Sequence, residues 1–425
     1  MTFPRLTVGP AGADLPGTTN VAVQAAVDRV AALGGGEVEV LPGTYTLEDS
    51  VHLRSHVTLC GHGAETVLRK APCVLSALSA DLGYGHFDIS LAEPDKFRVG
   101  MGVYIADDKS GGFYTTVATL TWQDGDRFGI NRMLNHDYSR GSNTVVKSLF
   151  PLVSGYNLTG ARVENLVLDG NREVNENLNG CRGGGIFLLQ AHGVQIRGVT
   201  VRNYNGDGIS FQQTTRMLIE DCVLQGQTGC GLHPGSGSVG SVMRRNKCLG
   251  NAGDGIFYCL RVTYSLCEDN EISGNGHDGI SIGGRDTHHI IRGNRITGSG
   301  RHGIYFRPAD PVMAGNWNQI EGNTLSGNCM KEGDAEVFVT NDTHHVHLLG
   351  NRFAEPTKRA PVVGVRVAER CKEIVVAGNE FGGGFAREVE ALCPEGELSY
   401  DPTCDRLPVG PENAPPGAAL HLDVR

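Results

Sequence analysis

Three aspartates, Asp207, Asp254 and Asp278, each stand directly before a Gly-Ile pair. On neighbouring turns of a repeat, Asp254 and Asp278 could serve as the paired carboxylates of glycoside hydrolysis, and carboxylates in such a column could also bind Ca²⁺. An aspartate before glycine also commonly accepts hydrogen bonds from the amides of its own turn. Catalysis needs a residue once, whereas this one recurs, so the repetition favours the structural role.

His233 is the most unusual single residue of the central part of the chain. It interrupts a column of small and aromatic residues and precedes Pro234-Gly235-Ser236, an irregular turn. A histidine changes its charge near neutral pH, so it can act as a general base or acid. The structural alternative is that its ring only forms hydrogen bonds with this turn.

Arginine, aromatic and further acidic residues follow on the next turns of the repeat. Arginine can bind a carboxylate through two parallel hydrogen bonds, which suits the acid group of a uronic acid sugar. We expect five of these residues to bind substrate: Arg261, Arg285, Asp286, Arg307 and Asp310. We expect three others to exchange protons with it: Tyr258, His302 and Tyr305. The alternative is that all of them are ordinary exposed residues.

These residues lie on a repeat of 23 or 24 residues. One glycine-centred motif begins at positions 184, 207, 230, 254, 278 and 302. Apolar residues alternate within it with period two, which is typical of β-strands. Asn246, Asn270 and Asn294 recur in phase, and we expect their side chains to form a ladder of internal hydrogen bonds. Short strands joined by glycine and asparagine turns predict an all-β fold, a right-handed parallel β-helix whose coils stack about 4.8 Å apart.

The repeat divides the chain into four predicted parts. Residues 1–71 hold a capping helix, from Thr19 or Asn20 to Leu33, and the first coils. Residues 72–150 interrupt the repeat with antiparallel-looking strands, which predicts a small β insertion. Residues 151–381 form the parallel β-helix, and residues 382–425 form a tail rich in Pro, Gly and Glu.

Composition excludes several classes of protein. The formal net charge is −10 and no basic stripe is present, which argues against nucleic acid as a partner. No apolar run is long enough to cross a membrane. The twelve cysteines show neither a CxxC pair nor zinc-like spacing, so we expect free thiols, no metal site and no nucleotide cofactor. Residues 1–5 lack the pattern of a signal peptide, and we therefore expect a cytoplasmic location.

The segment Gly34-Gly35-Gly36-Glu37-Val38-Glu39-Val40-Leu41-Pro42-Gly43-Thr44-Tyr45 resembles the start of the pectate-lyase-like superfamily. With the coils, the resemblance covers roughly residues 18–70 and 150–381. It implies a right-handed β-helix, and the superfamily includes lyases, epimerases, hydrolases and non-catalytic binders. Gly276-His277-Asp278-Gly279 is similar to a polygalacturonase stretch, with an extra aspartate, and His233-Pro234 stands where mannuronan epimerases carry a motif of which only the proline matches.

These observations favour an enzyme that acts on uronate-containing oligo- or polysaccharides by β-elimination or C5 epimerisation. Arg261, Arg285 or Arg307 would neutralise the uronate carboxylate, and His233 would take the neighbouring proton. Alternatives are a glycoside hydrolase that uses paired aspartates and a non-catalytic carbohydrate-binding β-helix. Whether Ca²⁺ is a cofactor stays open, as do the sugar and the oligomeric state.

Overall fold

The structure is a computed structural model and describes residues 4–401. The chain divides into two compact units, residues 1–188 with 199–210, and residues 189–198 with 211–425. Each unit contains coils of a right-handed parallel β-helix, as the 23–24-residue repeat predicted. The strands β17 (Ile186–His192) and β20 (Ile209–Gln212) contain residues of both units.

The first unit begins with the capping helix and the first coils. Helix α1 (Asn20–Ala32) packs against β1 and β3 and buries Val23, Ala26, Val27 and Val30. The paired coil strands of this unit are β2 (Leu15–Pro16), β1 (Arg5–Gly9), β3 (Gly36–Val40), β6 (Val57–Cys60) and β15 (Arg162–Glu164); β4 (Gly43–Leu47), β7 (Thr66–Lys70), β16 (Val167–Asp169) and β19 (Thr200–Arg202); and β5 (Val51–His52) with β14 (Val153–Thr159).

The interruption of the repeat is an antiparallel sheet with its own core. In spatial order its strands are β8 (Leu75–Ala77), β13 (Val145–Lys147), β10 (Gly102–Ala106), β11 (Thr116–Asp124), β12 (Arg127–Ile130) and β9 (Asp88–Ser90). Phe97, Phe128, Leu134 and Tyr138 are buried in its core. Short 3₁₀ helices occur at η1 (Gly63–Glu65), η2 (Pro94–Lys96), η3 (Gly112–Tyr114), η4 (Arg140–Ser142), η5 (Arg172–Val174) and η6 (Pro311–Met313).

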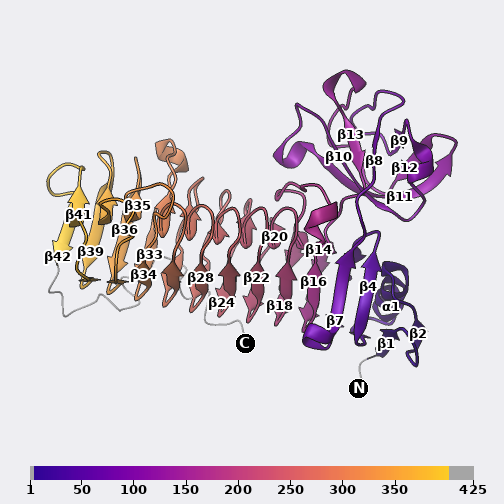
Figure 1. Cartoon of the computed structure of the whole chain (residues 1–425), viewed down its shortest axis with the longest axis horizontal. Coiled ribbons are helices and arrows are strands. Elements are labelled where there is room, and N and C mark those ends of the chain that lie inside the picture. Colours follow the sequence, from indigo (N-terminus) through magenta and orange to yellow (C-terminus); the bar gives the residue numbers. More distant parts are fainter. Residues whose placement is uncertain (1–3, 402–425) are drawn as a thin grey trace. The chain divides into compact units, whose positions relative to one another are not determined.

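The second unit consists of three parallel sheets, whose strands stack coil upon coil (Figure 1). The first sheet holds β18 (Gln195–Arg197), β21 (Leu218–Glu220), β24 (Val242–Arg244), β27 (Leu266–Glu268), β30 (Ile290–Arg292), β33 (Asn318–Glu321), β36 (His344–Leu349), β39 (Lys372–Ala377) and β42 (Leu398–Asp401). The second holds β22 (Val223–Gln225), β25 (Lys247–Leu249), β28 (Glu271–Ser273), β31 (Arg295–Thr297), β34 (Thr324–Ser326), β37 (Arg352–Phe353) and β40 (Glu380–Phe381). The third holds β23 (Leu232–Gly235), β26 (Ile256–Phe257), β29 (Ile280–Ile282), β32 (Ile304–Phe306), β35 (Ala335–Val339), β38 (Val363–Val367) and β41 (Arg387–Ala391).

The asparagine ladder holds neighbouring coils of this unit in register. Asn246 Nδ2 donates to Asn270 Oδ1 at 3.0 Å, and Asn270 Nδ2 donates to Asn294 Oδ1 at 2.8 Å. Each side-chain oxygen also accepts the backbone N–H of the asparagine one coil before it. The ladder continues through Asn323 and Asn351 to Asn379. The prediction of internal hydrogen bonding is therefore confirmed, and the ladder gives otherwise buried amides their partners.

Strand pairing runs beyond residue 381, where we expected the β-helix to give way to a tail. β38 pairs with β41, and β39 pairs with β42 as far as Asp401. The Gly-Ile and asparagine motifs do not recur after residue 381, so the sequence did not predict these strands. Backbone hydrogen bonds pair them without those motifs. Residues 402–425 of the expected tail lie outside the described residues.

Two expectations from composition concern the whole chain. The cysteines of the described segment are free thiols, as their spacing predicted. Among residues 4–401, no helix has both the length and the apolar character needed to cross a lipid bilayer.

Candidate functional site

One line of side chains points away from the interior along the third sheet of the second unit. Strand pairing sets Phe257 beside Ser281, Ser281 beside Tyr305, and Tyr305 beside Phe338. Residues alternate with these at the inward positions, where Ile256, Ile280 and Ile304 are fully buried. We call this line the outer row; its members are His233, Phe257, Ser281, Tyr305, Phe338 and Arg366.

Arginine side chains lie over all three aromatic rings of the outer row. The guanidinium of Arg307 is 4.3 Å from the centre of Phe257, and that of Arg301 is 4.6 Å from the centre of Tyr305. Arg366 lies 5.7 Å from the Phe338 ring. Cation–π contacts of this kind hold the guanidinium planes against the sheet. The outer row is thus an aromatic surface with a guanidinium over each of its three rings, on which polar ligands can stack and form hydrogen bonds.

Asp254 and Asp278 form a ladder of their own at the start of β26 and β29. Asp254 Oδ1 accepts the backbone N–H of Asp278 at 2.8 Å, and Asp278 Oδ1 accepts that of His302 at 3.1 Å. Arg301 also binds Asp278 through two hydrogen bonds of 2.9 and 2.6 Å. Burial, with the nearby charge of Asp278, raises the pKa of Asp254 to about 7. Both aspartates thus accept backbone N–H groups of the next coil, which is the structural role that the repetition of aspartate favoured.

The fully buried Asp286 and the partly exposed Arg307 form a second group beyond the other end of these strands. The Asp286 carboxyl accepts the backbone N–H groups of Val262 and Gly283, each at 3.0 Å. Arg307 lies 3.5 Å from this carboxyl and donates to Ser281 Oγ at 2.9 Å and to the Tyr258 carbonyl at 2.6 Å. Burial raises the pKa of Asp286 to about 7 despite the arginine. Asp286 is therefore an acid that can hold a proton near neutral pH.

A backbone carbonyl defines which ring nitrogen of His302 carries the hydrogen. Its Nδ1 lies 2.8 Å from the Ala335 carbonyl, which can only accept, so Nδ1 carries the hydrogen and Nε2 keeps the lone pair. Burial lowers the pKa of the ring, which keeps it neutral at pH 7. The ring stacks on Tyr305 at 4.9 Å. A neutral imidazole beside a phenol is suited to accepting a proton.

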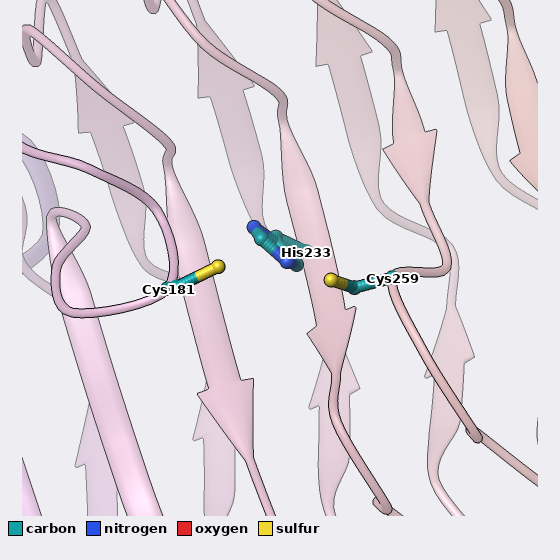
Figure 2. A group of neighbouring side chains, drawn as sticks. All are labelled: Cys181, His233 and Cys259. Carbon is teal, nitrogen blue, oxygen red and sulfur yellow. The ribbon is translucent and has the colours of Figure 1, made fainter. Parts of the chain in front are cut away.

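His233 lies in β23 with its ring edge-on to Phe257 at 5.2 Å. Figure 2 shows His233 and Cys259 on neighbouring coils with their side chains directed toward each other. A ring nitrogen of His233 lies within 4.8 Å of the Cys259 sulfur. Cys181, drawn in the same view, belongs to the first unit. His233 is thus a member of the outer row, as the alternation predicted, but its side chain is almost buried.

The remaining predicted residues separate into interior and exposed positions. Tyr258 is fully buried, stacks on His289 at 4.3 Å and accepts a hydrogen bond from Ser265 Oγ at 3.1 Å. It points inward because it lies one residue after Phe257, so it cannot reach a ligand on the outer row. Arg261, Arg285 and Asp310 are exposed.

The later coils of the outer row were not predicted from the sequence. Phe338 and Arg366 continue the row, and Arg366 pairs with Glu390 at 2.7 Å. Glu336, in the same strand as Phe338, is fully buried. Longer loops precede these strands, so the Gly-Ile alignment ends at residue 304. Asn323 and Asn351 continue the asparagine repeat through these coils, and their positions could have been used to align the later strands.

Comparison with known proteins identifies the fold. Residues 184–381 match a family model described as the right-handed beta helix region. The A-module of Azotobacter vinelandii mannuronan C-5 epimerase AlgE6 is 18% identical and superposes with a TM-score of 0.58, covering 90% of this chain and 94% of that chain. The Streptococcus pneumoniae surface adhesin PfbA is 13% identical, with a TM-score of 0.55 and coverage of 89% and 88%. The Dettilon tailspike protein is 14% identical, with a TM-score of 0.52 and coverage of 93% and 68%. A search by sequence among curated proteins finds no match.

One further match corrects the expected location. Residues 97–252 match the model of NosD, a periplasmic copper-binding protein. The expectation of a cytoplasmic protein is therefore wrong. It rested on residues 1–5, and the composition of so short a segment is a poor guide to the compartment in which a folded protein works. Likeness at these identities concerns the fold, and it confirms what the N-terminal motif implied: the chain is a right-handed parallel β-helix protein.

Proposed function

We propose that the protein acts on uronate-containing oligo- or polysaccharides, removing the proton at C5 of the sugar in a lyase or C5-epimerase reaction. The observation that carries the proposal is the pair of exposed arginines beside the outer row. Arg261 and Arg285 follow β26 and β29 on adjacent coils, and the Arg261 N–H donates to the Gly284 carbonyl at 2.7 Å. Two exposed arginines on adjacent coils, each following a strand of the aromatic surface, suit a chain of acidic sugars.

The chemistry follows from the charge that develops when C5 loses its proton. An arginine bound to the carboxylate stabilises that charge and makes the C–H bond more acidic. His302 is the base that the structure favours, because its Nε2 holds a lone pair at neutral pH. His233, the base expected from the sequence, remains the alternative. Tyr305, stacked on His302, would return a proton to the leaving oxygen or to the opposite face of the sugar.

The fold likeness supports this proposal without deciding the reaction. The AlgE6 module is a mannuronan C-5 epimerase and shares the fold over 90% of this chain. A glycoside hydrolase is a second candidate, favoured by the raised pKa values of Asp254 and Asp286, each to about 7, which would let either donate a proton to a leaving oxygen. Non-catalytic binding is the third candidate, and the adhesin PfbA shares the fold over 89% of this chain.

Copper binding is a separate candidate suggested by the NosD match. Imidazole nitrogen and thiolate sulfur are both ligands that copper takes, and His233 and Cys259 would supply one of each. Measuring the metal content of purified protein exposed to Cu(I), with Cys259→Ala as the variant, tests this candidate. Equal copper content in both proteins would contradict it.

The main experiment incubates the protein with polymannuronate, polygalacturonate and a neutral glucan in deuterated water. Elimination gives an unsaturated uronate that absorbs ultraviolet light, epimerisation places deuterium at C5, and hydrolysis gives only new reducing ends. We expect His302→Gln and Arg285→Ala to lose turnover, whereas Arg295→Ala, exposed on β31 of another sheet, keeps it. If the protein forms no product from any acidic glycan and binds none of them, the proposal is refuted.

A further inference from the structure

Trp122 lies flat on the outer face of the antiparallel sheet in the insertion. Strand pairing sets it beside Gly129 of β12, and Gly129 in turn lies beside Asp88 of β9 (Figure 1). A Cβ atom at Gly129 would collide face-on with the indole, because it would be almost equally close to three adjacent ring atoms, Nε1, Cδ1 and Cε2. One face of the ring therefore rests on the backbone of this glycine.

A β-bulge turns Trp122 out of the core. Leu120 pairs with Ile130 of β12. Two residues later Trp122 pairs with Gly129, so β11 advances by two residues where β12 advances by one. Without the extra residue Trp122 would pair with Phe128, whose ring is fully buried in the core of the insertion. The indole is instead 44% exposed, although its burial would stabilise the fold, and bulges often re-aim a side chain next to a functional site.

The second tryptophan of the chain shows what is particular to Trp122. Trp317 is 38% exposed, but its ring stacks on His345 at 3.6 Å and on His288 at 6.1 Å. Among residues 4–401, no aromatic ring and no cationic group stacks on Trp122. Trp122 thus presents a ring face to solvent, whereas Trp317 presents a ring edge.

Polar side chains lie on the same face of the sheet as the indole. Asp88 flanks Gly129 on the side away from Trp122, and Arg127, two residues before Gly129, points to the same face. Arg127 Nη2 donates to Asp88 Oδ2 at 2.6 Å, and the two side chains are 55% and 25% exposed. The second carboxylate oxygen can still accept a hydrogen bond, and the guanidinium has further N–H groups to donate. We call these four residues the indole platform.

The charge and the size of the indole platform indicate its ligand. Arg127 lies among three carboxylates, those of Asp88, Asp124 and Asp126, so an anionic ligand would be repelled. A protein partner would bury about 800 Å² on each side, whereas one aromatic side chain offers about 250 Å² at most. A neutral sugar ring fits better, because its flat C–H face is apolar and its hydroxyl groups point sideways, toward the donors and acceptors of the platform.

We propose that the indole platform binds neutral oligo- or polysaccharides. One sugar ring stacks on Trp122, while neighbouring hydroxyl groups of the glycan donate to Asp88 and accept from Arg127. Gly129 keeps the indole flat on the sheet. This surface belongs to the insertion in the first unit, and the inference does not depend on the proposed action of the outer row on acidic glycans.

Intrinsic fluorescence tests the proposal directly, because Trp317→Phe leaves Trp122 as the only indole of the chain. The full-length Trp317→Phe protein is titrated with cellohexaose, mannohexaose, xylohexaose and maltohexaose, and with an acidic hexagalacturonate. At least one neutral sugar should move the emission of Trp122 to shorter wavelength in a saturable way, and the acidic sugar should not. A constant emission with all four neutral sugars, or an equal shift with hexagalacturonate, would overturn the proposal.

Two substitutions test the stacking by calorimetric titration. Trp122→Ala removes the indole, and Gly129→Ala keeps it but displaces it from the sheet. Each should weaken binding of the best neutral hexasaccharide by about tenfold or more. Gly111→Ala is the matched control in the insertion, because its backbone is extended and the added Cβ would touch nothing, so its affinity should be unchanged.

Three results of these measurements would contradict the proposal. They are full affinity in Trp122→Ala, full affinity in Gly129→Ala, and a change in the oligomeric state of Trp122→Ala measured by light scattering. The last would show that a second copy of the chain covers the indole. If Trp122→Ala does not fold, the titration of Trp317→Phe and the affinity of Gly129→Ala decide.

Discussion

Glu336 should make the stability of this protein depend on pH in a way that one substitution can remove. Its side chain is fully buried in β35. The carboxyl accepts the backbone N–H of Asn328 at 3.2 Å and Asn328 Nδ2 at 2.6 Å, and within residues 4–401 no lysine or arginine pairs with it. Burial raises the pKa of this carboxyl from 4.5 to about 7.

The sign of the effect follows from where the proton is held. Between pH 4.5 and about 7 the folded protein keeps the proton on Glu336, whereas the unfolded chain has lost it. Folding then takes up a proton, so the contribution to stability is complete below pH 4.5 and is lost as pH rises to about 7. At about 1.4 kcal/mol per pH unit, the free energy of unfolding falls by about 3 kcal/mol across this window.

The assay is denaturant unfolding of the wild type and of Glu336→Gln at several values between pH 4.5 and 8. Glutamine has nearly the same shape and stays neutral, so the wild type should lose about 3 kcal/mol relative to the variant as pH rises. Asp254 and Asp286 titrate alike in both proteins and cancel in the comparison. Glu332→Gln, exposed in the preceding loop, is the matched control and should show no such difference. Parallel curves for Glu336→Gln and the wild type would refute the reasoning.

Three further predictions concern the coils of the second unit. Asn270→Ala leaves buried amide and carbonyl groups of two coils without partners and should lower the free energy of unfolding by about 3 kcal/mol, measured by denaturant unfolding; a loss below about 1 kcal/mol would contradict it. Arg301→Ala leaves the buried Asp278 carboxylate without its cation and should cost about 3–5 kcal/mol, with Arg301→Lys recovering part; equal stabilities would refute the role of the pair. Burial raises the pKa of the Cys248 and Cys267 thiols, so a thiol reagent should modify these two cysteines only when the protein unfolds. Rapid modification of either cysteine in the native protein would contradict this prediction.

The sequence predicted those features that depend on local periodicity. Alternation of apolar residues placed Phe257, Ser281 and Tyr305 on one face, and the recurring asparagines gave the ladder. The same alternation places Tyr258 inside, so the proton-transfer role that we expected for its hydroxyl is wrong. The pairing of His52 in β5 with Ser154 in β14 could not be predicted from the sequence, because 102 residues separate them and the insertion lies between them. Their pairing depends on which coil strand follows that insertion, and no periodic signal fixes this.

The four arginines that follow or cover the strands of the outer row differ in what they can offer a substrate. Arg301 already binds Asp278 twice, and Arg307 already binds Ser281, two carbonyls and Asp286, so a uronate could recruit either only by breaking bonds with buried partners. Arg261 makes one long contact, 3.3 Å to Ser236 Oγ, and is exposed, as is Arg285. Removing a buried partner costs several kcal/mol, whereas releasing an exposed contact costs little. The carboxylate of an acidic sugar should therefore bind at Arg261 and Arg285, while Arg301 and Arg307 hold the aromatic surface in place. Arg285→Ala should weaken substrate binding without changing the unfolding midpoint. Arg307→Ala should weaken substrate binding and also lower the unfolding midpoint. If instead Arg285→Ala lowers the midpoint and Arg307→Ala does not, the roles assigned to the two arginines are wrong.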